Sequence, residues 1–206
     1  ALQRPIRLGA DIVVHSTTKY LNGHADVLGG AVVGATSEIV DSLRWWVNCL
    51  GTPGAPFDAY QTLRGIRTLG VRMRAHGENA QALAELAAQH PAVRRTHYPG
   101  LADHPGHDLA CRQQSGFGGV LSFELADRAA VDRALDGLRC FSLAESLGGV
   151  ESLVCHPATM THAAMPPEVQ QAAGITDAML RLAVGIEQPE DLLADLRAAL
   201  DRAAAG

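Results

Sequence analysis

The sequence predicts a layered α/β fold, because strand-like segments alternate along the chain with segments of helical periodicity. An apolar run follows Asp11, and a second run over 120–125 is rich in apolar residues, as is typical of strands. Leu192, Leu196 and Leu200 recur at the spacing of one helix face. The 206 residues are enough for one large domain or parts of two.

Two strands and a helix are expected in the first 50 residues. Residues 11–15 and 27–33 are predicted strands, and the apolar centre of the first predicts that it is buried. Ser37 is predicted to cap a helix whose apolar residues continue at helical spacing to Leu50. The Gly- and Pro-rich run that follows ends this helix.

The remainder of the chain continues the alternation. A long helical region is predicted from about Asp58 to Gln89, with a bend near Gly65 or Gly70. The elements predicted after it are a loop-rich segment over 99–119, a strand over 120–125, a helix over 128–138, a strand over 180–184 and a helix that begins at Pro189.

The charge balance argues against a nucleic-acid-binding role. The chain has 17 Lys+Arg and 22 Asp+Glu, a net charge of −5, and no basic stripe that could neutralise phosphates. No segment reads as a membrane-spanning helix, and the first residues lack the basic and apolar regions of a signal peptide. We therefore expect no nucleic-acid partner and no membrane partner.

The four cysteines predict neither a redox motif nor a metal site. They form no C-x-x-C pair, so reduced thiols and a cytoplasmic location are expected. His104 and His107 lie in a Pro- and Gly-containing loop, and Cys155-His156 matches no metal-ligand spacing.

Lys19 is the only lysine, against 16 arginines. Its primary amine can condense with an aldehyde, whereas a guanidinium group remains protonated and cannot. If the segment is extended, the hydroxyls of Ser16 and Thr18 project to one side, where they could bind a phosphate, and Lys19 projects to the other. Pyridoxal phosphate needs both an amine and phosphate donors. A solvated lysine retained by chance is the alternative.

Four motifs extend this pattern over most of the chain. They are Gly9–Asp26 (GADIVVHSTTKYLNGHAD), Asp58–Leu69 (DAYQTLRGIRTL), Ala144–Ser152 (AESLGGVES) and Leu180–Glu187 (LRLAVGIE). In this order they resemble the pyridoxal-phosphate-dependent enzymes of Cys/Met metabolism.

The resemblance implies an aminotransferase-like α/β fold of type I. Residues 1–85 would form the end of the large cofactor-binding domain with the lysine and a connecting helix, and residues 86–206 the small C-terminal domain. Chains of the family are much longer, so this sequence is expected to be the C-terminal half of such an enzyme. A homotetramer with active sites shared between subunits is also implied.

The resemblance further implies the residues that hold the cofactor. Lys19 would bind pyridoxal 5'-phosphate covalently and move protons at the substrate carbons. Ser16 and Thr18 would bind the cofactor phosphate.

Three other residues would bind the amino-acid substrate. Arg181 would hold the substrate α-carboxylate, for which a planar two-pronged donor is suited. Ser146 would help to hold the carboxylate end and the lysine, and Glu145 would lie near the distal end of the substrate.

A subfamily follows from Trp45–Gly51 and Pro56–Tyr60, which look most similar to bacterial cystathionine γ-synthases. The implied reaction is γ-replacement on an O-acylated homoserine by cysteine to give cystathionine. The alternatives are γ-elimination of the cystathionine γ-lyase or methionine γ-lyase type and, in a different class, a non-catalytic remnant or assembly module. Trp46 is expected in the core, with Trp45 at its edge.

Overall fold

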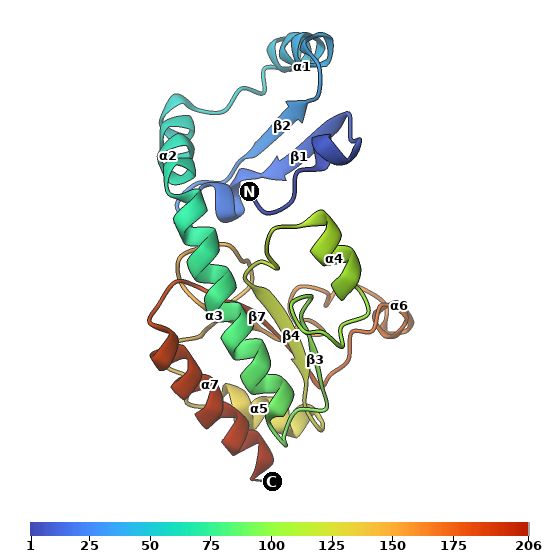
Figure 1. Cartoon of the computed structure of the whole chain (residues 1–206), viewed down its shortest axis with the longest axis vertical. Coiled ribbons are helices and arrows are strands. Elements are labelled where there is room, and N and C mark those ends of the chain that lie inside the picture. Colours follow the sequence, from blue (N-terminus) through green and yellow to red (C-terminus); the bar gives the residue numbers. More distant parts are fainter. Residues whose placement is uncertain (206) are drawn as a thin grey trace.

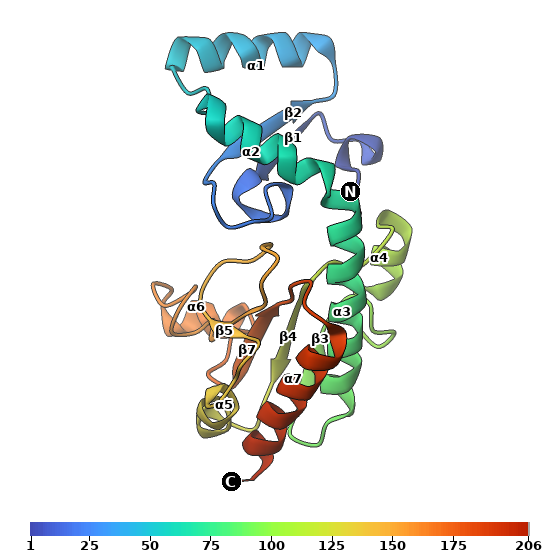
Figure 2. The ribbon, with the colours of Figure 1, turned by 90° about the vertical axis from the view of Figure 1, so that its left-hand side faces the viewer.

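The computed structural model describes residues 1–205, which form two sheets with one long helix leading from the first part to the second (Figure 1). A two-stranded sheet with two helices lies at one end, and a five-stranded sheet with the other helices lies at the opposite end. Helix α3, Leu69–Gln89, extends from the first part along the second (Figure 2).

The first sheet pairs β1, Ile12–Ser16, with β2, Gly30–Gly34, in antiparallel register, after a single 3-10 turn at Pro5–Leu8. The prediction that the first strand is buried is wrong, since Val14 is 74% exposed. The apolar run identified the strand correctly. Within residues 1–205, however, this sheet has only two strands, and side chains such as Val14 remain exposed.

Helix α1, Ser37–Leu50, ends at Gly51, which adopts a positive φ of 64°. Its cap is Thr36, whose hydroxyl accepts a hydrogen bond from the Ile39 amide, so the predicted Ser37 cap is displaced by one residue. Trp45 and Trp46 are 58% and 53% exposed and pack edge to face against each other. The expectation of a core Trp46 is therefore wrong, because α1 packs on β2 through residues nearer its start.

The long helical region consists of two helices, α2, Pro56–Arg67, and α3, which meet at Thr68. This break lies between the two glycines at which a bend was predicted. Gly65 is required for the packing of α2, because a side chain there would collide with the carbonyl group of Asn22.

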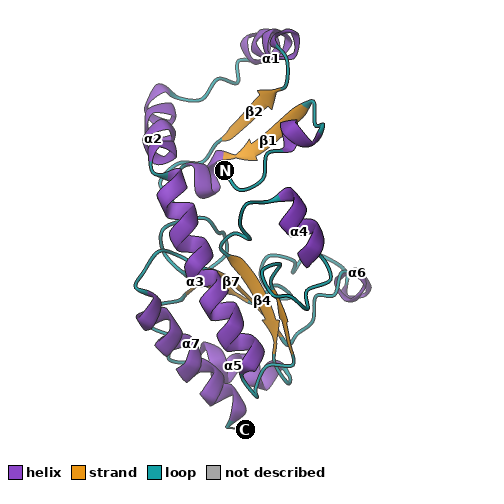
Figure 3. Ribbon diagram, in the orientation of Figure 1, coloured by secondary structure: helices purple, strands orange, loops and turns teal. Residues whose placement is uncertain are grey.

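The second sheet has the strand order β3-β4-β7-β6-β5, antiparallel except between β5 and β6. Its strands are β3 Arg95–His97, β4 Val120–Glu124, β5 Ser142–Leu143, β6 Leu153–Cys155 and β7 Met179–Ala183. The strands predicted over 120–125 and 180–184 are confirmed to within one residue (Figure 3).

The remaining helices are α4 His107–Gln113, α5 Arg128–Leu135, α6 Pro167–Ala172 and α7 Pro189–Ala204. The start of α7 at Pro189 is as predicted. Helix α4 lies inside the segment predicted to be loop, and α5 ends three residues earlier than predicted, before a turn in which Gly137 has a φ of 77°.

The core lies between the five-stranded sheet and helices α3, α5 and α7. It is built from small residues of α3 such as Ala84, leucines of α7 such as Leu196, and alternate strand residues such as Leu121, Phe123 and Leu182. Because β7 alternates, Leu180 and Leu182 enter this core and Arg181 points to the opposite face.

No helix in the described part of the chain is long and apolar enough to span a membrane. Helix α3 runs through residue 85 without interruption. The division into domains 1–85 and 86–206 stays a prediction.

Candidate functional site

Lys19 lies in a tight turn that immediately follows β1. Residues Thr17–Leu21, here called the lysine turn, form one turn of π-helix in which Lys19 itself leaves helical conformation, with φ −87° and ψ −135°. The amide of Asn22 donates to the carbonyl of Thr17 (2.9 Å), and that of Gly23 donates to the carbonyl of Lys19 (2.8 Å). The turn presents a half-buried lysine at a fixed place.

The structure brings three of the predicted site residues together. The Lys19 amine donates a hydrogen bond of 2.8 Å to the Ser146 hydroxyl. The Arg181 Nη2 donates one of 3.0 Å to the Ser146 carbonyl oxygen. Ser146 therefore joins the amine and the guanidinium group, although the three residues lie far apart in the sequence.

The loop that carries Ser146 is held in an unusual conformation. Ser146 has a φ of 86°, which L-residues rarely adopt, and Gly148 has a φ of 85°. A Cβ atom at Gly148 would lie 2.7 Å from the Tyr20 amide nitrogen, so glycine allows the loop to pack directly on the lysine turn. In Figure 2 this loop rises from the five-stranded sheet toward the first sheet.

Arg181 retains an unused donor at this site. Its Nε is buried and has no hydrogen-bond partner among residues 1–205. A buried guanidinium nitrogen without a partner is costly, and an anion bound beside it would satisfy it. The arrangement can therefore bind a carboxylate next to Ser146.

Ser16 and Thr18 do not lie on one side of an extended segment, because the chain turns after Ser16. Ser16 and Lys19 line the same cavity, of about 370 Å³. The Thr18 hydroxyl instead accepts a hydrogen bond from the Gly29 amide (3.0 Å) and donates to the Gly29 carbonyl (3.4 Å). The prediction that both hydroxyls project to one side of an extended segment is therefore wrong.

Glu145 is exposed and makes no hydrogen bond or ion pair within residues 1–205. Its charge acts on the buried thiol of Cys155. Cys155 lies opposite Arg181 in the register of β6 and β7. Burial raises the pKa of that thiol, Arg181 lowers it, and Glu145 raises it. The opposite charges of Glu145 and Arg181 therefore shift the pKa of the same thiol in opposite directions.

Sequence reasoning missed Arg72, which is only 4% exposed. Its guanidinium group holds the lysine turn by donating to the Tyr20 carbonyl, and burial lowers its pKa. Tyr20 packs edge-on against His76, and burial raises the pKa of its phenol to about 12. The signal was present as polar residues on one face of the long predicted helix, at positions 72, 76 and 79.

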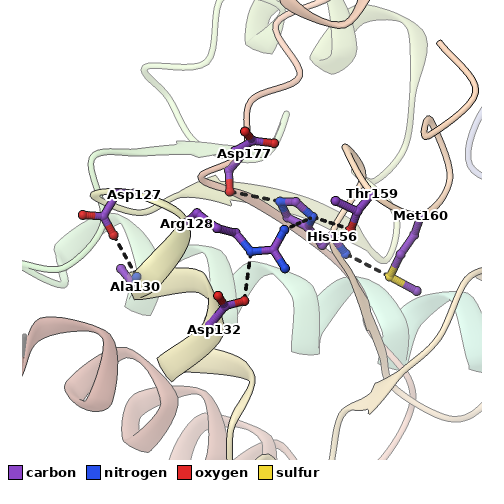
Figure 4. Close-up of polar contacts among 8 residues, drawn as sticks. All are labelled: Asp127, Arg128, Ala130, Asp132, His156, Thr159, Met160 and Asp177. Atoms are coloured by element: carbon purple, nitrogen blue, oxygen red, sulfur yellow. Dashed lines mark hydrogen bonds and ion pairs between the residues drawn. The ribbon is translucent and has the colours of Figure 1, made fainter. Parts of the chain in front are cut away.

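His156, one of the three histidines considered as metal ligands, is engaged in structural hydrogen bonds (Figure 4). His156 Nε2 donates to the Asp177 carbonyl (3.0 Å), and its Nδ1 accepts from the Thr159 hydroxyl (2.8 Å). Arg128 approaches the same Nδ1 at 3.4 Å while donating to Asp132. Among residues 1–205, no three His, Cys, Asp or Glu side chains are grouped to hold a metal ion.

Comparisons with known proteins match this chain over nearly its whole length. Residues 1–201 match the family model described as Cys/Met metabolism PLP-dependent enzyme. Cystathionine γ-synthase of Escherichia coli is 53% identical over 197 residues, covering 95% of this chain. Cystathionine β-lyase of Coxiella burnetii is 51% identical over 201 residues, covering 97%.

A solved structure shows the same fold. Cystathionine γ-synthase from Xanthomonas oryzae pv. oryzae, in complex with aminoacrylate and cysteine, superposes with a TM-score of 0.96 at 62% identity over 100% of this chain. The predicted type I fold and cofactor class are confirmed. The chain spans 51–53% of the length of these relatives. It belongs to the pyridoxal-phosphate-dependent enzymes of Cys/Met metabolism.

Proposed function

We propose that this chain contributes the lysine and the carboxylate-binding arginine to an enzyme that makes cystathionine from an O-acylated homoserine and cysteine. The carrying observation is the pair of hydrogen bonds by which Ser146 joins Lys19 (2.8 Å) to Arg181 (3.0 Å). An amine for the cofactor aldehyde and a donor for the amino-acid carboxylate lie on either side of one serine, as an amino-acid enzyme of this family requires.

The residues fit pyridoxal phosphate. Lys19 and Ser16 face one cavity of about 370 Å³, and Arg181 keeps a buried donor without a partner. Lys19 would hold the cofactor aldehyde, while Ser16, with Thr18 after a rotation of its hydroxyl, would donate to the phosphate. When bound, the cofactor supplies the electron sink for bond breaking next to the substrate nitrogen.

Arg181 and Ser146 would orient the amino-acid substrate. The Arg181 Nη2 is already fixed by the Ser146 carbonyl, so the free Nε is aimed before the substrate arrives. A substrate carboxylate bound there would be placed within reach of Lys19, and this fixed geometry lowers the entropic cost of reaction.

Lys19 would move protons at Nζ. Its hydrogen bond to Ser146 restricts a long flexible side chain to one direction. A neutral amine held in this way would accept a proton from a substrate carbon and return it at the next carbon. Glu145, exposed near the same site, would attract the ammonium group of a thiol substrate.

The choice of γ-replacement is supported by the 62% identity to a synthase that is described in complex with cysteine. The second candidate is γ-elimination, because a cystathionine γ-lyase of Bacillus subtilis is 50% identical, close to the 53% of the E. coli synthase. The homotetramer, the shared active sites and the cytoplasmic location remain predictions.

Product analysis tests the proposal. The assembled enzyme that contains this chain is loaded with pyridoxal phosphate and incubated with an O-acylated homoserine, with and without cysteine, beside the matched K19A variant. Cystathionine that forms only with cysteine and Lys19 supports replacement, and a 2-oxo acid formed without cysteine supports elimination. The absence of both products, with no cofactor attached at Lys19, overturns the proposal and favours a non-catalytic module.

A further inference from the structure

We propose that Arg72, His76 and Asn79 of α3 are positioning residues that set the lysine turn against the strand carrying Arg181. These three side chains, here called the α3 stripe, are 4%, 0% and 5% exposed. The functional meaning of the spacing rests on the proposed function, whereas the mechanical claim concerns the fold of this chain alone.

Arg72 forms the end of the stripe that contacts the lysine turn. Its Nη1 donates to the Tyr20 carbonyl (2.9 Å), Nη2 to the Gly65 carbonyl (2.8 Å) and Nε to the Thr68 hydroxyl (3.0 Å). A Cβ at Gly23 would collide with the guanidinium group, so glycine leaves room for it against the lysine turn. One rigid fork thus fixes the turn, the end of α2 and the start of α3.

His76 and Asn79 form the other end of the stripe. His76 Nδ1 donates to the Val184 carbonyl (2.6 Å), and Asn79 Nδ2 donates to the carbonyls of Gly185 (3.2 Å) and Glu187 (3.0 Å). These carbonyls belong to the segment directly after β7. That strand carries Arg181.

The segment after β7 is tied in turn to the loop of Ser146. The Glu187 carboxylate accepts hydrogen bonds from the Ser152 amide (2.6 Å) and hydroxyl (2.8 Å), and the Ser152 hydroxyl accepts one from the Gly185 amide (2.8 Å). Asn79 therefore acts on a rigid unit rather than on a free loop end.

The spacing of the stripe explains how one helix can hold both the lysine turn and the segment after β7. Positions i, i+4 and i+7 lie on one face of a helix, so three polar side chains point the same way from a stiff axis. Among the buried side-chain nitrogens of the stripe, His76 Nε2 alone has no partner within residues 1–205. Apart from the Thr68 hydroxyl, every hydrogen-bond acceptor of this stripe is a backbone carbonyl. Such contacts hold backbone position and give no other chemistry.

Hydrogen exchange tests the mechanical claim without any cofactor. We expect R72M to speed exchange of the Asn22 and Gly23 amides, which close the lysine turn, and N79A to speed exchange of the Gly185 and Ile186 amides. The matched controls are R74M and E78A, exposed positions of the same helix. Equal exchange in R72M and R74M at the turn overturns the proposal.

Borohydride trapping of pyridoxal phosphate tests the consequence for Lys19. Peptide mass spectrometry measures the fraction of the Lys19 peptide that carries the adduct. We expect R72M to lower this fraction by about 10-fold, and R74M to leave it unchanged. An unchanged fraction in R72M overturns the positioning role.

Two safeguards keep the outcomes separate. If R72M does not fold, R72K replaces it, since it keeps the charge and packing but cannot form the three-bonded fork. If the unaltered chain forms no adduct at Lys19, the proposed function fails, while the exchange pattern still decides whether the α3 stripe holds the turn.

Discussion

The Lys19 amine and the Ser146 hydroxyl are 2.8 Å apart although 127 positions separate them in the sequence. The contact depends on two backbone features, the tight turn after β1 and the positive φ of Ser146. The carbonyl of the same serine accepts from Arg181, so a displacement of this loop alters both the amine and the guanidinium group.

Replacement of Lys19 by alanine is expected to abolish covalent attachment of pyridoxal phosphate at this position. It removes the only lysine side chain, and no arginine can take its place because a guanidinium group does not condense with the aldehyde. Peptide mass spectrometry after borohydride reduction measures the adduct. K19R should behave as K19A does, and an adduct-forming K19R would contradict the assignment.

Replacement of Arg181 by lysine is expected to raise KM for the amino-acid substrate by about 10- to 100-fold, the effect of losing a charge-assisted hydrogen bond. The reason is that lysine lacks the Nε that stands buried without a partner. Steady-state kinetics of the assembled enzyme, with exposed R197K as control, measures it. An unchanged KM in R181K would show that the carboxylate binds elsewhere.

Replacement of Gly148 by alanine is expected to weaken the contact between the Ser146 loop and the lysine turn. The new Cβ would lie 2.7 Å from the Tyr20 amide nitrogen. Gly174→Ala is the matched control, because Gly174 also has a positive φ, of 74°, but has open space around it. Both variants should lose about 1 kcal/mol of unfolding free energy through backbone strain, and G148A should lose more because its Cβ would collide with the lysine turn. Only G148A should also reduce trapping of pyridoxal phosphate at Lys19; equal trapping would refute the idea.

His76 is expected to make folding stability depend on pH. Burial lowers its pKa, an effect that the hydrogen bond to Val184 opposes, so the folded state keeps the ring neutral while the unfolded chain binds a proton below about pH 6.5. Because the unfolded state then binds more protons, the free energy of unfolding falls as the pH falls below that value. The free energy of unfolding, measured with urea between about pH 5 and about pH 8, should depend less steeply on pH for H76Q than for the exposed control H24Q. An identical slope would contradict the prediction.

The cap of α1 is expected to reside in Thr36 rather than Ser37. Thr36→Ala removes the hydroxyl that accepts from the Ile39 amide and should cost about 1 kcal/mol of helix stability. Ser37→Ala, one residue inside the helix, should cost little. Hydrogen exchange of the first amides of α1 distinguishes the two, and a larger effect for S37A would restore the cap expected from the sequence.

The sequence predicted the elements whose signals are local. The end of α1 follows from Gly51 and the start of α7 from Pro189, and the break between α2 and α3 lies between Gly65 and Gly70. Periodicity also identified β4 and β7. These features depend on residues within a few positions of each other, so the sequence contains them.

The sequence mispredicted the burial of some apolar residues. Val14 lies in an apolar run and Trp46 on an apolar helix face, yet they are 74% and 53% exposed. Burial depends on what packs against an element, and periodicity identifies an apolar face without its partner. The same limit applies to Ser16 and Thr18, whose directions were set by a turn that alternation did not reveal.

By itself, the sequence determined the chemistry available to this protein: one amine at Lys19, an arginine in an apolar strand at Arg181, and the motifs that identify the family. Only the tertiary structure decided that Ser146 joins the two and that Arg72 holds the turn beneath them. The physical reason is that side-chain identity and local backbone preference are encoded residue by residue. Contacts such as these, across 35 to 127 positions, exist only after the elements have packed.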